Sequence, residues 1–188
     1  EKVTFVGAIG GGTNLLEVEV SASATAEFQS TVDVVTFDID NDVILFENGN
    51  VVGTDGGNAG ALNFAASAGL TLNDTIVAGE TVFTGTTAAT QGLVVASGLT
   101  VNLPSNFTSG TITFWNGDQG DTTTDVSNTT MNDTALTDYT ANTADSENDV
   151  TFTVSKKSDA TCATELGVNT DVCNAFEQAR DSAISDSN

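Results

Sequence analysis

The stretch LEVEVSASATAEF, residues 16–28, alternates apolar and polar side chains along its whole length. Leucine, valine, alanine and phenylalanine fall on one face, while glutamate, serine and threonine fall on the other. A period of two residues is typical of a β-strand with one face in a core and the other in water. The stretch therefore predicts one long antiparallel strand, or two strands joined by a bend.

Further short segments of this kind recur along the chain, with Gly, Asn or Asp between them. They are residues 35–39, 43–46, 62–66, 71–77, 81–84, 93–96, 99–103, 111–115 and 150–154. Asn48-Gly49 lies between two apolar segments, which is the strongest short signal for a β-hairpin. We therefore expect an all-β fold, an antiparallel β-sandwich or jelly roll.

The chain divides into three parts by pattern. Residues 1–14 hold a short apolar strand and a glycine joint, residues 15–155 form the expected β-sandwich, and residues 156–188 hold two cysteines and a helical pattern. Within the sandwich, residues 118–149 are acidic and poor in apolar residues, which indicates a long surface loop. The helical pattern predicts one short C-terminal helix, with an apolar stripe of Val172, Phe176, Ala179 and Ala183.

Charge is the strongest signal in the composition. The formal net charge is −22, and the 4 basic residues are Lys2, Lys156, Lys157 and Arg180. Nucleic acid needs clustered Lys and Arg, so we expect no nucleic-acid partner. No apolar run is long enough to span a membrane, so we expect no membrane insertion.

The cysteine and histidine counts bear on location and chemistry. Cys162 and Cys173 are the only two cysteines, and an even count in such a chain favours a disulfide and an extracellular, cell-surface location. The sequence contains no His, which removes the usual nucleophile–base pairs and the usual zinc ligands. We therefore expect a protein that is not an enzyme.

Two acidic segments are candidate calcium sites. DIDND supplies Asp38, Asp40 and Asp42, and NGDQGD supplies Asp118 and Asp121. The first lacks the Gly and Glu that complete an EF-hand loop, so a solvated strand face is the competing interpretation. Four Asn-x-Ser/Thr sites for glycosylation, about the number expected by chance, begin at Asn73, Asn106, Asn128 and Asn132.

The N-terminal segment, VTFVGAIGGGTN, joins an apolar strand to a run of glycines. The strand includes Val3, Phe5, Val6, Gly7 and Ile9, and the expected hinge is Gly10, Gly11 and Gly12. One interpretation is a hairpin in which residues 3–9 fold back on residues 15–20. The other is that residues 3–9 leave their own subunit and complete the sheet of a neighbour, because a strand on a glycine tether moves at low steric cost. Such a head-to-tail join does not close, so it yields a filament.

A β-domain with a terminal apolar strand and a glycine joint resembles the subunits of extracellular filaments built by donor-strand complementation. Examples are biofilm-matrix fibres of the camelysin/TasA type and archaeal bundling pili. The resemblance implies a structural subunit of a pilus or biofilm-type fibre, with further copies of itself as the partner. The alternative is a secreted, monomeric adhesin or carbohydrate-binding domain, with calcium-supported loops that contact glycans.

Overall fold

The structure is a computed structural model of the 188-residue chain. It describes residues 1–10, 15–21, 23–53, 60–66, 68–86, 92–96, 99–104, 106–117, 126, 129–131, 133–144 and 149–185. The positions of the strands agree with the prediction, because almost every segment predicted as a strand is a strand. The pairing of these strands, however, differs from the prediction.

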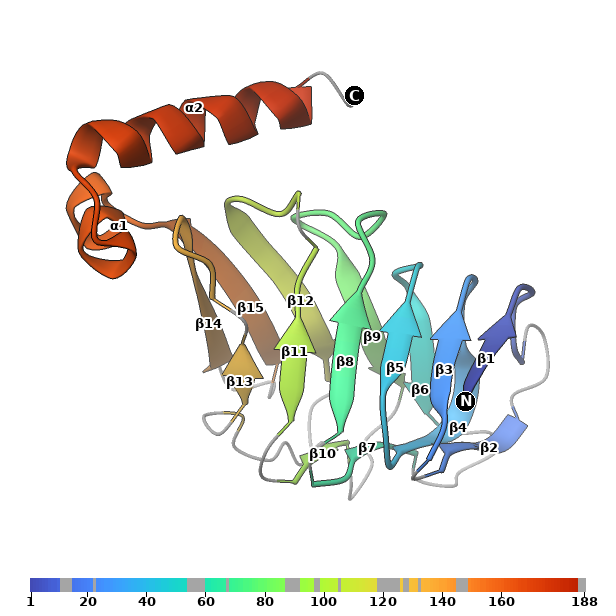
Figure 1. Ribbon diagram of the computed structural model, residues 1–188. Helices are drawn as coiled ribbons and strands as arrows, with labels where there is room; N and C mark the ends of the chain where they lie inside the picture. The colour runs from blue at the N-terminus through green and yellow to red at the C-terminus, as the bar shows by residue number, and fades with distance from the viewer. Residues whose placement is uncertain are drawn as a thin grey trace.

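The first sheet has six strands, and all of its neighbours run parallel. Its order is β1 (Lys2–Phe5), β3 (Thr25–Phe28), β5 (Val43–Leu45), β8 (Gly69–Leu72), β11 (Thr100–Asn102) and β13 (Thr130–Met131). These strands come from six well-separated parts of the chain, so each one begins a new turn of the chain (Figure 1).

The second sheet has nine strands and bends at β4. Its order is β10 (Leu93–Val95), β7 (Ala61–Phe64), β4 (Asp33–Ile39), β6 (Asn50–Gly53), β9 (Thr81–Thr86), β12 (Gly110–Asn116), β15 (Asp149–Lys156) and β14 (Thr137–Ala144), with β2 (Leu15–Val20) also paired to β4. The start of β4 pairs with β6 and its remainder pairs with β7, while β2 pairs with β4 from Val34 to Ile39. The sheet thus forms two walls that meet within β4.

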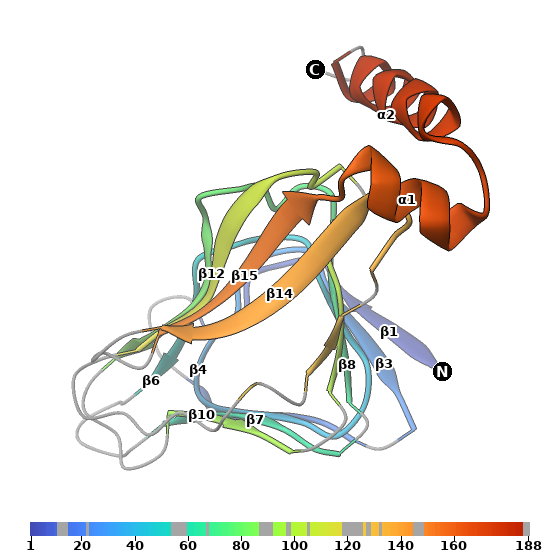
Figure 2. The same cartoon turned by 90° about the vertical axis from the view of Figure 1, so that its left-hand side faces the viewer.

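Together the two sheets form a three-sided parallel β-solenoid. The chain rises along the first sheet, crosses over, descends along β6, β9 and β12, and returns along β7 and β10, which winds it in a right-handed sense (Figures 1 and 2). The prediction of an antiparallel β-sandwich or jelly roll is therefore wrong. The prediction assumed that strands with one solvent-exposed face pair antiparallel. In this solenoid the walls are mainly parallel, and they have one face in the core and the other exposed to solvent.

Stacked side chains fill the interior of the solenoid. Equivalent positions on the first sheet are apolar in every turn, namely Val3, Ala26, Val43, Leu70, Val101 and Met131. Phenyl rings also contact one another along the interior, through Phe5, Phe28, Phe37, Phe83, Phe114 and Phe152. The core is therefore a column that extends along the axis, rather than a layer between two sheets.

A buried asparagine links three successive turns at one corner. Asn50 is fully buried, and its Oδ1 accepts a hydrogen bond from the Val32 amide at 2.9 Å. Its Nδ2 donates to the Glu47 and Val82 carbonyls, at 2.9 and 3.0 Å. The preceding Gly49 has φ +70, so Asn48-Gly49 is a turn, but β5 and β6 belong to different sheets and form no hairpin with each other. The predicted hairpin is in fact a corner of the solenoid.

The C-terminal end of the solenoid is closed by antiparallel strands and two helices. β15 runs antiparallel to both β12 and β14. α1 (Asp159–Leu166) and α2 (Thr170–Ser185) follow, where the sequence predicted one short helix. Ser158 caps α1 by accepting a hydrogen bond from the Thr161 amide, and Gly167 ends it with φ 65, so local capping signals for this helix were present. The predicted disulfide between Cys162 and Cys173 is present, and it joins two helices where the sequence predicted only one.

Candidate functional site

The N-terminal coil, which we define as β1, residues 6–10 and β2, lies at the open end of the solenoid. Within the described residues, β1 pairs only with β3, and β2 pairs only with β4. Each strand therefore has one outer edge whose backbone groups face away from the sheet. Exposed strand edges are templates for pairing with a further strand, which makes this coil the candidate functional site.

The N-terminal strand lies in the sheet of its own chain. The Gln29 amide donates to the Phe5 carbonyl at 2.8 Å, and the Ile9 amide donates to the Thr31 carbonyl at 3.0 Å. β1 and β2 belong to different sheets, so the predicted hairpin between residues 3–9 and 15–20 does not form. The structure contains one chain, and strand donation to a neighbour stays a prediction.

Large apolar side chains are exposed on this coil. Val6 is 72% exposed and Leu16 is 69% exposed, and Val3, Phe5 and Leu15 are exposed to a smaller degree. Beside them a pocket of about 180 Å³ opens between β1, β2 and β3, lined by residues that include Val3, Val18 and Phe28. The interior column therefore reaches the surface at this end.

Phe5 marks the point where the column of rings ends. One face of its ring stacks on Phe28, with the ring centroids 4.9 Å apart and the planes 8° from parallel. Phe28 is 1% exposed, but Phe5 is 38% exposed. Phe28, Phe37, Phe83 and Phe114 each contact rings on both sides along the column, which ends at Phe152 in one direction and at Phe5 in the other. Phe5 therefore occupies a position that one more turn of a solenoid would cover.

The glycines of the N-terminal segment differ in their surroundings. A Cβ on Gly7 would meet no atom within 4 Å, but a Cβ on Gly10 would lie 1.8 Å from the Asp33 carbonyl oxygen. Gly10 also has φ +88, which side-chain-bearing residues rarely adopt. Gly10 is thus packed against the next turn, while the predicted hinge residues Gly11 and Gly12 lie outside the described residues.

The predicted calcium ligands of DIDND lie at the end of β4 and at the corner between β4 and β5. Asp38 lies on β4, and its partial burial, together with Asp40, Glu17 and Glu19, raises its pKa. Asp42 lies at the next corner, against Gly69 of β8. The described part of the chain contains no group of three or more acidic or Cys side chains placed to hold a metal ion. Asp118 and Asp121 lie outside the described residues.

Two of the four glycosylation candidates are described. Asn73 follows β8, where its Oδ1 accepts from the Thr75 amide at 3.3 Å, and it is half-buried. Asn106 is exposed, and its Nδ2 donates to the Asp74 carbonyl at 3.0 Å. Both lie in turns between strands. Asn128 and Asn132 lie outside the described residues.

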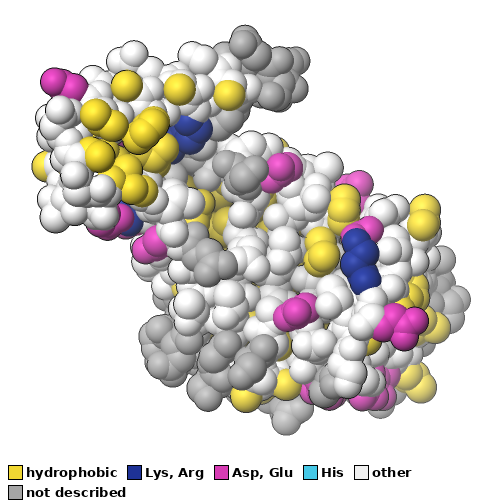
Figure 3. Space-filling view, viewed as in Figure 1, with side chains coloured by type: hydrophobic (Ala, Val, Ile, Leu, Met, Phe, Trp, Pro, Cys, Tyr) yellow, Lys and Arg dark blue, Asp and Glu magenta, His cyan; other side chains and the backbone are white. Residues whose placement is uncertain are grey.

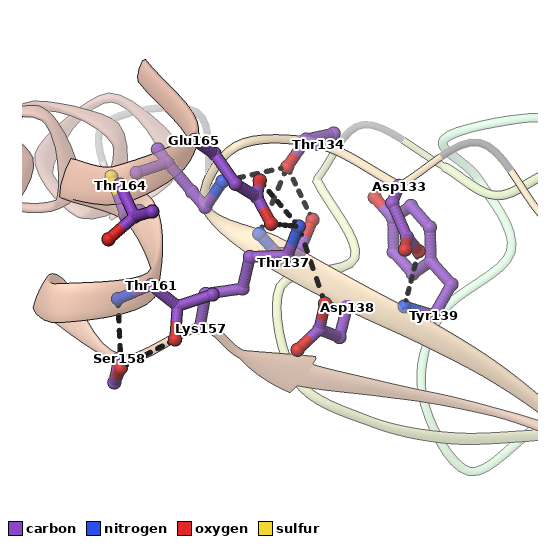
Figure 4. Close-up of polar contacts among 12 residues, drawn as sticks. Asp133, Thr134, Thr137, Asp138, Tyr139, Lys157, Ser158, Thr161, Thr164 and Glu165 are labelled. Atoms are coloured by element: carbon purple, nitrogen blue, oxygen red, sulfur yellow. Dashed lines mark hydrogen bonds and ion pairs between the residues drawn. The ribbon is translucent and has the colours of Figure 1, made fainter. Parts of the chain in front are cut away.

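The opposite end of the solenoid is anchored by a lysine. The Lys157 ammonium, whose side chain is 5% exposed, contacts Glu165 of α1 at 2.8 Å and Asp138 of β14 at 3.3 Å (Figure 4). The hydrogen bond to Glu165 is the main cause that raises the pKa of Lys157. These contacts fix α1 to the closing hairpin of β14 and β15, which ends the parallel stacking on the wall of β12 only. Among the described strands, β13 and β10 at this end and β1 and β2 at the other each keep one unpaired edge.

α2 does not bury the stripe that its sequence predicts. Phe176 is 51% exposed, and Ala179 and Ala183 are exposed as well. The helix buries Cys173 and Glu177 instead, and Glu177 forms an ion pair with Lys156 of β15. None of the described helices has the length and hydropathy needed to cross a membrane.

Comparison of the chain with family models, with curated proteins and with solved structures finds no match in any of the three.

Proposed function

We propose that this chain is a structural subunit of an extracellular filament, and that copies join end to end through the N-terminal coil. The observation that carries the proposal is the open coil itself, with its free backbone edges, its exposed apolar side chains and the uncovered ring of Phe5. Covering it with one further turn of solenoid would bury these groups. Each large apolar side chain buried in this way contributes about 1.5 to 3 kcal/mol.

The other end offers strand edges that suit such a join. Among the described strands, β13 pairs only with β11, and β10 pairs only with β7. Both run in the same direction as β1 and β2 within their sheets. A head-to-tail stack that sets β1 beside β13 and β2 beside β10 keeps the strand direction unbroken, and such a contact repeats without closing.

Because β1 is hydrogen-bonded within its own chain, we favour pairing along its outer edge over its transfer to the neighbour. Glu17 and Glu19 also lie on the exposed strand β2, and charges on an edge strand oppose uncontrolled pairing. With a net charge of −22 on each copy, repulsion between copies is strong at low salt. The Debye length falls from about 10 Å at 0.1 M salt to about 3 Å at 1 M, so assembly should increase with ionic strength.

The disulfide and the acidic surface support an extracellular setting. The chain contains the Cys162–Cys173 disulfide, and disulfides in general persist in oxidising compartments and are rare in the cytosol.

The test is assembly of the purified chain at rising concentration and salt, followed by sedimentation velocity and negative-stain microscopy. We expect rods that lengthen with salt. The double variant Val6→Lys, Leu16→Lys places charge on two exposed side chains of the coil and should leave the chain monomeric, with its fold unchanged. Val77→Lys is the matched control, because Val77 is 47% exposed in the turn between β8 and β9.

A wild-type chain that stays monomeric at every salt concentration would overturn the proposal. So would rods that form equally well from the double variant, since the contact would then lie elsewhere on the surface.

A further inference from the structure

A shallow pocket lies on the outer face of the first sheet, the face turned away from the core. Its volume is about 240 Å³, below the range of drug-sized sites, so a ligand that fills it must be small. The polar side chains that line it belong to Thr25, Asp42, Thr71, Thr100 and Asn102. Figure 3 shows this face of the molecule, and the surface over β8 and β11 is mostly neither charged nor hydrophobic. The pocket is therefore polar, in contrast to the apolar N-terminal coil.

The pocket is hollow because Gly69 has no side chain. Gly69 pairs with Thr100 of the next strand, so the two residues lie in one row across the sheet. A Cβ on Gly69 would collide with Oδ1 of Asp42, and its nearest neighbours would all be side-chain atoms of Asp42. The Asp42 carboxylate therefore lies over the gap that Gly69 leaves.

The Asp42 carboxylate has no protein partner. Within the described part of the chain, no group donates a hydrogen bond to it or forms an ion pair with it. No Lys or Arg lines the pocket, and the formal net charge of −22 makes the surroundings negative. These observations favour a cationic group beside Asp42 and disfavour any acidic ligand.

Threonine hydroxyls supply the other polar groups of the pocket. Each hydroxyl donates one hydrogen bond and accepts others. The Thr71 hydroxyl accepts from Nδ2 of Asn102 at 3.2 Å, which leaves its own hydrogen to donate. Thr25 on β3 and Thr100 on β11 are three strand spacings apart, about 14 Å, so these groups do not converge on one point. A ligand with several hydroxyls spread over a ring reaches more of them than a compact ion does.

Two other kinds of occupant fit the pocket less well. A calcium ion takes about six to eight oxygen ligands, several of them from carboxylates, and Asp42 is the only acidic residue that lines the pocket. An extended peptide binds by pairing its backbone with a strand edge. This pocket lies on a sheet face, where the backbone groups of β5, β8 and β11 already pair with neighbouring strands.

We propose that this pocket binds an amino sugar in its protonated form. The ammonium group donates hydrogen bonds to the Asp42 carboxylate, and the ring hydroxyls exchange hydrogen bonds with the threonine hydroxyls. One face of the ring lies against Ile44, which also lines the pocket and is half-buried. The pocket shares no residue with the N-terminal coil, so this proposal does not depend on assembly.

The experiment is an NMR titration of the full, oxidised chain with methyl glucosaminide at about pH 6, below the pKa of an amino group. Salt near 0.15 M screens the general attraction of cations to the acidic surface. We expect saturable binding of one ligand per chain, with shift changes centred on Thr25, Thr71 and Thr100. Methyl glucoside, which has a hydroxyl in place of the amino group, should bind about 3- to 10-fold more weakly, because hydrogen bonds to charged groups are stronger than neutral ones. Cyclohexylammonium, which has the charge but no hydroxyls, should also bind more weakly.

Variants of the pocket separate its two contributions. Asp42→Asn should remove the preference for the glucosaminide over the glucoside, and it conserves the size of an exposed side chain, so the fold is undisturbed. The matched control is Glu47→Gln, which removes an exposed carboxylate beyond the other end of β5 and should leave both affinities unchanged. Gly69→Val fills the hollow and should abolish the binding of both sugars.

Three results would overturn the proposal. The first is the lack of saturable binding of the glucosaminide to the wild-type chain. The second is equal affinity for the glucosaminide and for either comparison ligand, because the amino group or the hydroxyls would then play no part. The third is unchanged glucosaminide binding in both Asp42→Asn and Gly69→Val, because the ligand would then bind elsewhere on the surface.

Discussion

Replacement of Asn50 by leucine tests whether the corner asparagine holds successive turns of the solenoid together. Leucine has nearly the same size but no polar atoms, so the Val32 amide loses its acceptor inside the protein. Loss of that acceptor costs about 1 to 3 kcal/mol, and the two lost bonds to the Glu47 and Val82 carbonyls cost about 0.5 to 1.5 kcal/mol each. Burial of the leucine side chain offsets part of this. We therefore expect the free energy of unfolding to fall by about 2 to 4 kcal/mol.

The assay is unfolding in guanidinium chloride, followed by the fluorescence of Trp115, which is the only tryptophan and is 1% exposed. The midpoint should shift while the slope of the transition stays constant, which indicates a change in stability alone. Asn116→Leu is the control, because Asn116 is exposed at the end of β12. If the two variants lose the same free energy to within about 0.5 kcal/mol, the cross-turn role of Asn50 is refuted, since surface substitutions change stability by about that amount.

Three further predictions concern charge, covalent closure and the backbone. Burial and neighbouring carboxylates raise the pKa of Asp38, so its ionised form lowers stability at neutral pH, and this penalty disappears below its ordinary value of 3.8. Asp38→Asn should therefore raise the unfolding free energy by about 0.2 to 1 kcal/mol at pH 7 and by nothing at low pH, measured by denaturant titration at several pH values. Replacement of Cys162 and Cys173 by serine should cost the helical unit about 2 to 3 kcal/mol, so that helical circular dichroism is lost at lower denaturant than the Trp115 signal. Gly10→Ala should lower the melting temperature, because Gly10 has a positive φ and the added Cβ would clash with the Asp33 carbonyl oxygen. Gly7→Ala should not lower it, because a Cβ on Gly7 meets no atom within 4 Å. Equal effects of the two substitutions would contradict the close approach at Gly10.

Strand positions were predictable because the period of two residues is a local property. Residues 16–28 form β2 and β3 with a bend between them, one of the two outcomes that the alternation predicts. The partner of each strand was not predictable in the same way. Antiparallel and parallel sheets give the same alternation of apolar and polar residues when one face is exposed to solvent. An Asn-Gly pair such as Asn48-Gly49 can form a corner of a solenoid as well as a hairpin turn, so it does not distinguish the two.

The turns of the solenoid also lack a regular period. The stacked positions Ala26, Val43, Leu70, Val101 and Met131 are unequally spaced, because the segments between the walls differ in length from one turn to the next. Repeat architectures are recognised from sequence by a constant period, and this chain has none. For the same reason Asn50 resembles an ordinary loop asparagine in the sequence, and only the stacked turns give its side chain three partners.

The helical pattern shows a related limit. The spacing of Val172, Phe176 and Ala179 correctly predicts a helix, since the period of side chains along one element is local. The spacing does not determine whether this stripe is buried, because burial depends on what packs against the element. The helix is fixed instead by the disulfide and by the Lys156–Glu177 ion pair, and the apolar stripe is left exposed.

The two ends of the solenoid differ in a way that follows from how such folds gain stability. Each turn is stabilised chiefly by contact with its two neighbours, so a terminal turn needs a cap or a partner. At the C-terminal end, antiparallel β15 and β14 stop the parallel stacking, and the disulfide-linked helices follow. At the N-terminal end nothing among the described residues takes that role, and Phe5, Val6 and Leu16 remain in contact with water. An end that is apolar, uncapped and bordered by unpaired strand edges is stabilised most by a surface of the same architecture, which is why we propose the joining role for this coil.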